Sequence, residues 1–513
     1  MKLALIKKVG IGLAITMTLS TIASVIWANG QLDRMYGGKV KRVKSSLFEP
    51  TEGKIIIRNV SVLSPEADSM LPNRTVMLED GKIVSINTTY QQTTGTEVID
   101  GTGKYLIPGL TDTHIHLWKS QNDLLLYLAN GVTHVWELMS LYPKHLKWRQ
   151  EIEDGTRLGP KLMVASNKLK SFDYLEGKFH QWSQGTILVN EASEAPEVIS
   201  TIMDGGYDAV KIGTFLNRES YIAVNKAAAE KGIPVIGHIP LDITLEDLWN
   251  SHQSEVAHIE EFVKHINKEF GWYSSKTAGE FLVMVEERSE EIAHKLIERN
   301  ISVTPTLWLM ESFPKQKFTL RTALSQIRLS YANTGLVEGT PMAKRALGWV
   351  PGRNTYERQD ITDPERKKGI LIYWETYAEA CRILLRVMAK EGVQIMAGTD
   401  ANVPIAVPGF SLHDELVSMH NAGMTPSQVL RSTTTNPANW LDLKSGKILP
   451  DYRADLVLLE NNPLENIEHT TSIEAVFAKG AYFDREMLDA MLESVKQANQ
   501  GSKQLSHEGN DKI

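Results

Sequence analysis

The sequence has almost no cysteine and no excess of positive charge. Cys381 is the only cysteine among 513 residues, which excludes an intramolecular disulfide and a thiolate metal cluster. The 55 lysines and arginines are outnumbered by 62 aspartates and glutamates, giving a formal charge of −7, which argues against a nucleic-acid binder. Hydrophobic residues at 42% and charged residues at 23% are typical of a globular protein. A chain of this length holds one large domain with an accessory domain, or several smaller ones.

Charge is also missing from residues 9–28, VGIGLAITMTLSTIASVIWA, which follow Lys2, Lys7 and Lys8. A basic start before an apolar segment is typical of a secretory signal, and this segment approaches the about 20 residues that span a bilayer. We therefore expect residues 1–30 to be a signal peptide or a retained N-terminal membrane anchor. A buried core helix fits the lysines and the terminal position less well. Either form places the rest of the chain outside the cytoplasm, in the periplasm or at the cell surface.

Short strands with turn signals occur near both ends of the chain. A polar, basic stretch at residues 31–52 is expected to be a linker. The strand pattern then runs over residues 53–106, with a hairpin signal at Asp80-Gly81, and returns over residues 444–484. These two remote pieces predict one small β-sandwich domain. Residues 485–513 predict a C-terminal helix and a polar tail.

Strands and helices alternate over residues 107–443. Eight apolar, β-branched runs are separated mostly by helical stretches such as residues 217–232. Eight such units predict an α/β fold, a (β/α)8 TIM barrel. An open doubly wound sheet is the alternative, but no glycine-rich phosphate loop follows the first run. The spacing before the eighth run predicts an insertion at about 310–369, either a wall or lid of the pocket or a surface decoration.

The carboxyl ends of the eight runs carry most of the chemically competent side chains. Active sites of TIM barrels form at these ends. The residues found there are His114 and His116 on the first run, Lys211 on the fourth, His238 on the fifth, His258 on the sixth and Asp400 on the eighth. The first two histidines are two apart on an extended segment, so their side chains point to the same side, as a pair of metal ligands would. Each residue alone has an ordinary structural explanation, but their common position favours a metal site.

The phrases THIHL, VKIG, GH, AH and GTD together resemble the metal-dependent amidohydrolase superfamily, in its binuclear, prolidase-like and imidazolonepropionase-related group. The resemblance extends from about Gly53 to Gly480 and includes PGLTDTHIH and RADLVLLENNPL. It departs at Asp451, where relatives usually have glycine, and this concerns a turn and not the chemistry. The resemblance implies two divalent metal ions, the first held by His114, His116, Lys211 and Asp400, and the second held by Lys211, His238 and His258.

The resemblance also implies that Lys211 is carboxylated by carbon dioxide and that the carbamate bridges the two ions. Burial lowers the pKa of a lysine and makes its neutral amine available to react, whereas pairing with a carboxylate is the structural alternative. Nitrogen and oxygen ligands suit Zn²⁺, the expected metal, and also manganese, iron or nickel. A hydroxide that bridges the two metals would attack the substrate, and Asp400 would act as general base and then as general acid.

We therefore expect an exported, metal-dependent amidohydrolase that hydrolyses an amide bond of a dipeptide (Xaa-Pro-like) or an N-acyl amino acid. The alternatives are an aminohydrolase (deaminase), a cyclic amide or lactone hydrolase, and a non-catalytic scaffold. Deaminases tend to carry a glutamate where Leu241 stands, and no metal ligand is lost as in a scaffold. The expected partner is a small-molecule substrate and no nucleic acid; membrane attachment through residues 9–28 and a homo-oligomer stay open. His413 and Arg353 are candidate substrate contacts, although His413 fits packing at a helix start slightly better.

Overall fold

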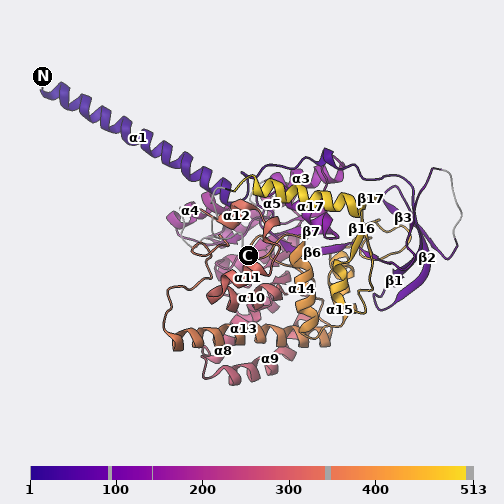
Figure 1. The fold of residues 1–513 in the computed structure, drawn as a ribbon. Helices are drawn as coiled ribbons and strands as arrows, with labels where there is room; N and C mark the ends of the chain where they lie inside the picture. Colours follow the sequence, from indigo (N-terminus) through magenta and orange to yellow (C-terminus); the bar gives the residue numbers. More distant parts are fainter. Residues whose placement is uncertain (1, 90–94, 141–142, 341–347, 504–513) are drawn as a thin grey trace.

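The fold is that of a computed structural model that describes residues 2–89, 95–140, 143–340 and 348–503. Figure 1 shows a barrel in the middle, a β-sheet domain on one side and a long N-terminal helix that projects from the body. The barrel was predicted from the alternation of strands and helices, and the sheet domain from short strands near both chain ends.

Seven short parallel strands and one irregular segment form the barrel. The strands are β6 (Leu110–Ile115), β7 (Val132–Glu137), β8 (Lys161–Val164), β11 (Val210–Ile212), β12 (Val235–Gly237), β13 (Gln253–Ala257) and β14 (Ser302–Thr304). A bridge between Ala165 and Ala209 joins the first three strands to the next four. Bridges from Val303 to Ile395 and from Ile115 to Ala401 then add residues 395–401 and close the ring. The predicted (β/α)8 barrel is confirmed, and its eighth member is held by isolated bridges instead of a regular ladder.

Helices surround the barrel. They are α2 (Asp123–Ala129), α3 (Lys144–Glu153), α5 (Ala195–Asp204), α6 (Arg218–Lys231), α7 (Leu245–Trp249), α8 (Glu260–Phe270), α9 (Ala278–Glu298), α13 (Pro364–Glu391), α14 (Phe410–Asn421), α15 (Pro426–Ser432) and α16 (Thr435–Trp440). The helix α6 illustrates how the sequence sets their ends. Asn217 caps its first turn by accepting a hydrogen bond from the Ser220 amide, and Gly232 ends it with a φ of 72°. Val224 and Ala228 on its inner face are fully buried.

Strands from the two chain ends form the β domain. Its sheet contains β1 (Ile55–Leu63), β2 (Met70–Glu79), β3 (Lys82–Asn87), β4 (Glu97–Asp100), β5 (Tyr105–Pro108), β15 (Leu456–Leu459), β16 (Ile473–Ala478) and β17 (Ala481–Asp484). The N-terminal β5 pairs antiparallel with the C-terminal β15, which joins the remote pieces. Asp80 and Gly81 have φ values of 50° and 74°, so the predicted hairpin signal forms the turn between β2 and β3. The helix α17 (Arg485–Gln500) then packs on α2.

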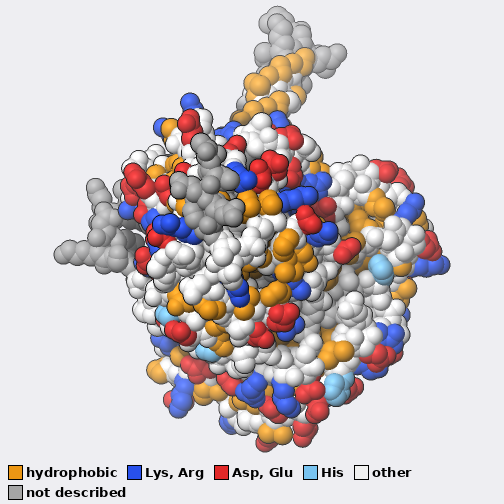
Figure 2. Space-filling model, turned by 90° about the vertical axis from the view of Figure 1, so that its right-hand side faces the viewer, with side chains coloured by type: hydrophobic (Ala, Val, Ile, Leu, Met, Phe, Trp, Pro, Cys, Tyr) orange, Lys and Arg blue, Asp and Glu red, His pale blue; other side chains and the backbone are white. Residues whose placement is uncertain are grey.

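The N-terminal helix α1 (Lys2–Met35) is longer than the segment that the sequence outlined. It contains a stretch, Leu13–Met35, that is long and apolar enough to cross a membrane by length and composition. Figure 2 shows the described part of this helix as an apolar rod that stands clear of the body. The helix continues past residue 30 because Met35 and Arg34 are buried against α12 (Thr334–Glu338), where Arg34 forms an ion pair with Glu338. The polar chain that follows holds one short 3-10 helix, η1 (Ser45–Leu47).

The insertion before the eighth barrel segment is a compact helical layer. It contains α10 (Leu307–Phe318), α11 (Leu320–Ser325), η3 (Leu329–Tyr331) and α12, and it ends at α13. Trp349 is fully buried and packs with Leu320, Leu324, Val337 and Val407 in a small core of its own. The remaining short elements are β9 (Leu169–Lys170), α4 (Tyr174–Gln184), β10 (Ile187–Leu188), η2 (Ala192–Glu194) and η4 (Ile467–Thr471).

Candidate active site

Three of the predicted metal ligands meet at the junction of the first and eighth barrel segments. The ligand atoms of His114, His116 and Asp400 all lie within 4.8 Å of one another. The Nε2 atom of His116 lies 2.8 Å from Oδ1 of Asp400, and Nε2 of His114 lies 3.4 Å from the same oxygen. Asp400 reaches this position because its amide donates a hydrogen bond of 2.8 Å to the His114 carbonyl. The arrangement is that of a group that could hold one metal ion.

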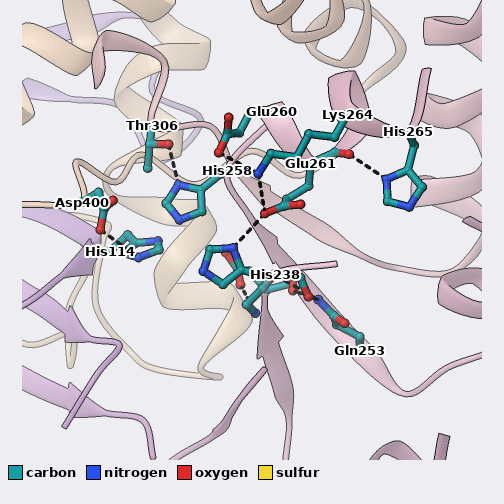
Figure 3. A network of polar contacts seen from close by, with 12 residues as sticks. His114, His238, Gln253, His258, Glu260, Glu261, Lys264, His265, Thr306 and Asp400 are labelled. Atoms are coloured by element: carbon teal, nitrogen blue, oxygen red, sulfur yellow. Dashed lines mark hydrogen bonds and ion pairs between the residues drawn. The ribbon is translucent and has the colours of Figure 1, made fainter. Parts of the chain in front are cut away.

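The histidines that follow β12 and β13 line the other side of the same space, as Figure 3 shows. The ring of His258 lies 4.6 Å from that of His114 and 5.0 Å from that of His238, centroid to centroid. Nδ1 of His238 lies 2.8 Å from Oε1 of Glu261, and Nδ1 of His258 lies 2.8 Å from Oγ1 of Thr306. Partners at Nδ1 fix each ring and leave Nε2 available, which is how metal-binding histidines are oriented.

Lys211 lies in the middle of β11 and is fully buried. Its Nζ atom has no hydrogen-bond partner within the described part of the chain. Burial lowers the pKa of Lys211, while the charges of Glu255 and Asp400 act to raise it. A glycine makes the position possible, because a Cβ atom at Gly237 would come within 2.9 Å of Cδ of Lys211. The structure therefore keeps a lysine side chain at a place where an unpaired ammonium group is unfavourable.

Several nitrogen atoms of the histidines in the cluster also lack hydrogen-bond partners in the described chain. Both ring nitrogens of His114 and Nδ1 of His116 lack hydrogen-bond partners among the described residues. Burial lowers the pKa of both histidines, and lowers that of His258 to about 3, so the rings are neutral at neutral pH. Neutral imidazole is the form that binds metals. Unpaired buried polar atoms are rare in folded proteins, and here they fit divalent cations.

Asp400 is a carboxylate in this setting. Burial alone would raise its pKa, but a hydrogen bond from His116 and the charge of Lys168 hold the pKa of Asp400 below its usual range. A group that stays ionised can both bind a cation and accept a proton.

Comparison with known proteins identifies the chain. Residues 214–482 match the family model described as the Amidohydrolase family, which is more than half of the chain. The chain belongs to the amidohydrolase family. The match includes His238, His258 and Asp400. The protein is therefore a hydrolase of carbon–nitrogen bonds, in a family that typically binds divalent metal ions, and its histidine–aspartate group is a candidate for such binding.

Three similar proteins illustrate the range of this family. A bottromycin amidohydrolase superposes with a TM-score of 0.68 at 20% identity, over 91% of this chain and 96% of that one. A Xaa-Pro dipeptidase with bound methionine superposes with a TM-score of 0.57 at 16% identity, over 84% of this chain and 100% of that one. A 5'-deoxyadenosine deaminase of Methanococcoides burtonii is 23% identical over 434 residues, which cover 80% of this chain and 84% of that protein. The two structural likenesses support the amidohydrolase fold.

Sequence reasoning missed two titratable groups of the amidohydrolase site. Glu137 ends β7 and is fully buried; it accepts a hydrogen bond of 2.8 Å from the Met139 amide, and burial raises its pKa to about 8. Lys168 follows β8, and its charge acts on His114, His116 and His238. Both follow the rule that found the other residues, since they lie at or just beyond the carboxyl ends of the second and third strands.

A third missed residue, Asp112, ties the first strand to the eighth segment. Its Oδ2 accepts a hydrogen bond of 2.7 Å from Oγ1 of Thr399, and its Oδ1 accepts one of 3.2 Å from the His114 amide. Burial raises the pKa of Asp112 to about 7. The residue touches only the backbone of the candidate ligand, so we assign it a positioning role.

The insertion contributes a side chain near the amidohydrolase site. Tyr356 packs against Phe313 at 4.7 Å between ring centroids. Burial, followed by the charges of Asp400 and Glu260, raises the pKa of Tyr356. The phenol therefore lies within electrostatic range of both carboxylates, while a role of the insertion as a wall of the pocket stays a prediction.

The two candidate substrate contacts lie in other surroundings. Nδ1 of His413 lies 2.9 Å from Oγ1 of Thr470, and its Nε2 lies 3.1 Å from the Asn130 carbonyl oxygen. Both nitrogens are engaged by the protein, so the structure gives His413 a packing role, and the candidate substrate contact is corrected. Arg353 lies in the insertion, where its amide donates a hydrogen bond of 3.0 Å to the Val350 carbonyl. A contact between Arg353 and substrate stays a prediction.

Proposed function

We propose that this amidohydrolase hydrolyses an amide bond in a small molecule with a free carboxylate, either a dipeptide of the Xaa-Pro kind or an N-acyl amino acid. The observation that carries the proposal is Lys211, a buried lysine whose Nζ has no hydrogen-bond partner in the described chain and whose charge acts on His114. The amine of a lysine in this position, once converted to a carbamate, could be a ligand shared by two metal ions. The fold shared with a Xaa-Pro dipeptidase is consistent with the substrate class.

The residues present fit two divalent ions. His114, His116 and Asp400 would hold one ion, His238 and His258 would hold the other, and Lys211 would serve both. Reaction of the Lys211 amine with carbon dioxide would form a nitrogen–carbon bond and release one proton to solvent, and the resulting carbamate would supply oxygen ligands to the ions. When bound, Zn²⁺ or a similar divalent ion supplies an activated water and polarises the substrate carbonyl.

The protein's own residues perform the proton transfer and the positioning. Asp400 accepts the proton of the attacking water and donates it to the leaving amine, because its lowered pKa keeps it ionised before the reaction. Glu261 and Thr306 hold the rings of the two histidines beyond the central strands. Lys168 places a positive charge beside the site, which suits a substrate carboxylate. Tyr356 covers the side of the site toward the insertion.

Deamination is the second candidate. The 5'-deoxyadenosine deaminase of M. burtonii, 23% identical to this chain, favours it. The side chain of Leu241 argues against it, because it is apolar and 53% exposed where deaminases of this superfamily tend to carry a glutamate.

One assay separates the two candidates. Full-length protein loaded with Zn²⁺ is incubated with Xaa-Pro dipeptides, N-acyl amino acids and adenine nucleosides, and released amino acids and ammonia are measured separately. Amino acid release that disappears in Lys211→Ala supports the proposal, with Glu287→Ala on the exposed surface as a control. Release of ammonia alone supports the deaminase. If neither the amide substrates nor the nucleosides are turned over, both candidate functions are wrong.

We infer that α1 anchors the enzyme in a membrane and that the barrel lies outside the cytoplasm. The basic residues Lys2, Lys7 and Lys8 before the apolar stretch support this placement, as does the length of Leu13–Met35. Protease added to cells with a permeabilised outer membrane should digest the barrel. A barrel that stays protected until the inner membrane is lysed would contradict the placement.

A further inference from the structure

The short helix α4 (Tyr174–Gln184) has its large apolar side chains on the outside. Leu175, Phe179 and Trp182 are 79%, 56% and 44% exposed, and Tyr174 beside them is 75% exposed. They lie at positions i, i+4 and i+7 and therefore form one continuous face. Such an outward apolar face is unusual for a helix that covers a soluble barrel.

The inner face of α4 explains why these side chains cannot turn inward. Gly177 and Ser183 are the buried residues of the helix. A Cβ atom at Gly177 would come within 2.7 Å of Cδ1 of Leu188 in β10, so the glycine lets the helix pack closely on this side chain. The chain therefore places its smallest residues against the body and its aromatic residues toward the outside.

The outer face of α4 lies beside α1. Nε1 of Trp182 donates a hydrogen bond of 2.9 Å to Oδ1 of Asn29, and the Tyr36 hydroxyl donates one of 2.9 Å to the Ser183 carbonyl. The exposed apolar surface of α1 ends at Trp27, which is 53% exposed, two residues before Asn29. The apolar part of α1 thus ends next to α4, at the base of the projecting helix, as Figure 1 shows.

We propose that the outer face of α4 docks onto the surface of the bilayer that α1 crosses. An amphipathic helix with tryptophan, phenylalanine and leucine on one face is suited to the boundary between headgroups and acyl chains, where tryptophan and tyrosine also gather. Lys178 on the same helix is exposed, and its cation complements anionic headgroups.

Docking of α4 would orient the active site. The helix follows the third barrel strand and so belongs to the face that carries the candidate metal ligands. The Tyr36 ring at the base of α1 lies 5.5 Å from the ring of Trp118, which stacks on His116 at 5.8 Å. The membrane surface would therefore hold the mouth of the barrel close to the lipid, which favours amide substrates that partition into the bilayer. This consequence for the substrate rests on the proposed activity, and the docking rests on the proposed α1 anchor alone.

Fluorescence quenching by lipids tests the docking in the full-length protein. A single introduced cysteine is labelled with an environment-sensitive fluorophore, while the native Cys381 is buried. The protein is reconstituted in vesicles of phosphatidylethanolamine and phosphatidylglycerol, with or without lipids that carry a nitroxide near the headgroup. Leu175→Cys reports the α4 face. Val283→Cys, a 60% exposed apolar position on α9 at the other end of the body, is the matched control.

Quenching at position 175 is expected to be at least about threefold greater than at position 283. Equal quenching at the two positions, or none at position 175, would overturn the proposal. The outer face of α4 would then be assigned to binding a second protein. A third label, Ser24→Cys with a nitroxide deep in the acyl chains, reports insertion of α1. If the label at position 24 is not quenched, α1 does not insert in the bilayer and the proposed anchor is wrong. The label at position 175 separately tests whether α4 contacts the membrane surface.

Discussion

Replacing His413 with leucine is expected to destabilise the fold in a pH-dependent way and to leave catalysis intact. The His413 ring connects α14 to η4 and to the end of α2, because Nδ1 contacts the Thr470 hydroxyl and Nε2 donates to the Asn130 carbonyl. Leucine fills a similar volume but leaves both partners without the ring. At neutral pH the loss of two buried hydrogen bonds should reduce the free energy of unfolding by about 1–3 kcal/mol.

The pH dependence follows from the pKa of the same histidine. Burial lowers the pKa of His413 to about 4, whereas the pKa of an unfolded histidine is near its ordinary value of 6.5. Between these two values the unfolded chain binds a proton that the folded protein does not, so stability is lost as the pH falls. From about pH 7.5 to about pH 5 the wild type should lose about 2 kcal/mol through this group, and the variant should lose none through it. Other buried histidines are common to both proteins and cancel in the comparison.

The assay is urea unfolding of both metal-free proteins, followed by circular dichroism at the two pH values. The variant should be less stable at the higher pH, and the difference should shrink by about 2 kcal/mol at the lower pH. The kcat/KM for the substrate identified in the panel should change by less than about twofold. A difference in stability that is the same at both pH values would refute the titration argument. A large loss of kcat/KM with unchanged stability would restore His413 as a substrate contact.

Three further substitutions probe the site and the base of α1. Lys211→Met should lower the metal content of the purified protein without destabilising the metal-free form, since it removes a buried group with no hydrogen-bond partner among the described residues. Elemental analysis measures the metal content, and thermal unfolding measures the stability. Full metal content would contradict the ligand role. Glu261→Gln should weaken metal binding by about 10–100-fold in a chelator competition, because the carboxylate orients His238, and an unchanged affinity would exclude this role. Arg34→Met should remove the ion pair with the buried Glu338 and loosen the base of α1, seen as faster proteolysis after α1; wild-type resistance would show that the pair does not hold the helix.

The barrel and most of its candidate ligands could be predicted because both follow from local rules. Apolar runs of β-branched residues define the strands, and the residue at the end of each run has to lie on the catalytic face. This rule placed His238 and His258, two positions with no other distinguishing feature in the sequence. Applied to every run, it would also have found Glu137 and Lys168.

Other features could not be predicted because they depend on contacts between remote segments. The roles of His413 and Asp112 are set by Thr470 and Thr399, which lie 57 and 287 residues away along the chain. The outward face of α4 arises because β10 approaches Gly177 closely, and the helix pattern alone does not show which face is buried. The insertion packs around Trp349 in a core of its own, for which its sequence carries no repeated period.

The irregular eighth segment has a physical reason that connects the fold to the site. Asp400 has a φ of 56°, and His258 and Thr306, which lie beside it, have φ values of 72° and 49°. Residues other than glycine rarely adopt this left-handed region, and each such residue costs about 1–2 kcal/mol. The barrel holds this strain with backbone hydrogen bonds of 2.8 Å from the Asp400 amide to the His114 carbonyl and from the His258 amide to the Thr304 carbonyl. A regular strand at residues 395–401 would close the ring with a longer ladder, but it would not turn the Asp400 carboxylate toward His116. Residues 395–401 are therefore irregular at the position where the carboxylate must face the site. Backbone hydrogen bonds to β6 and β14 stabilise that conformation.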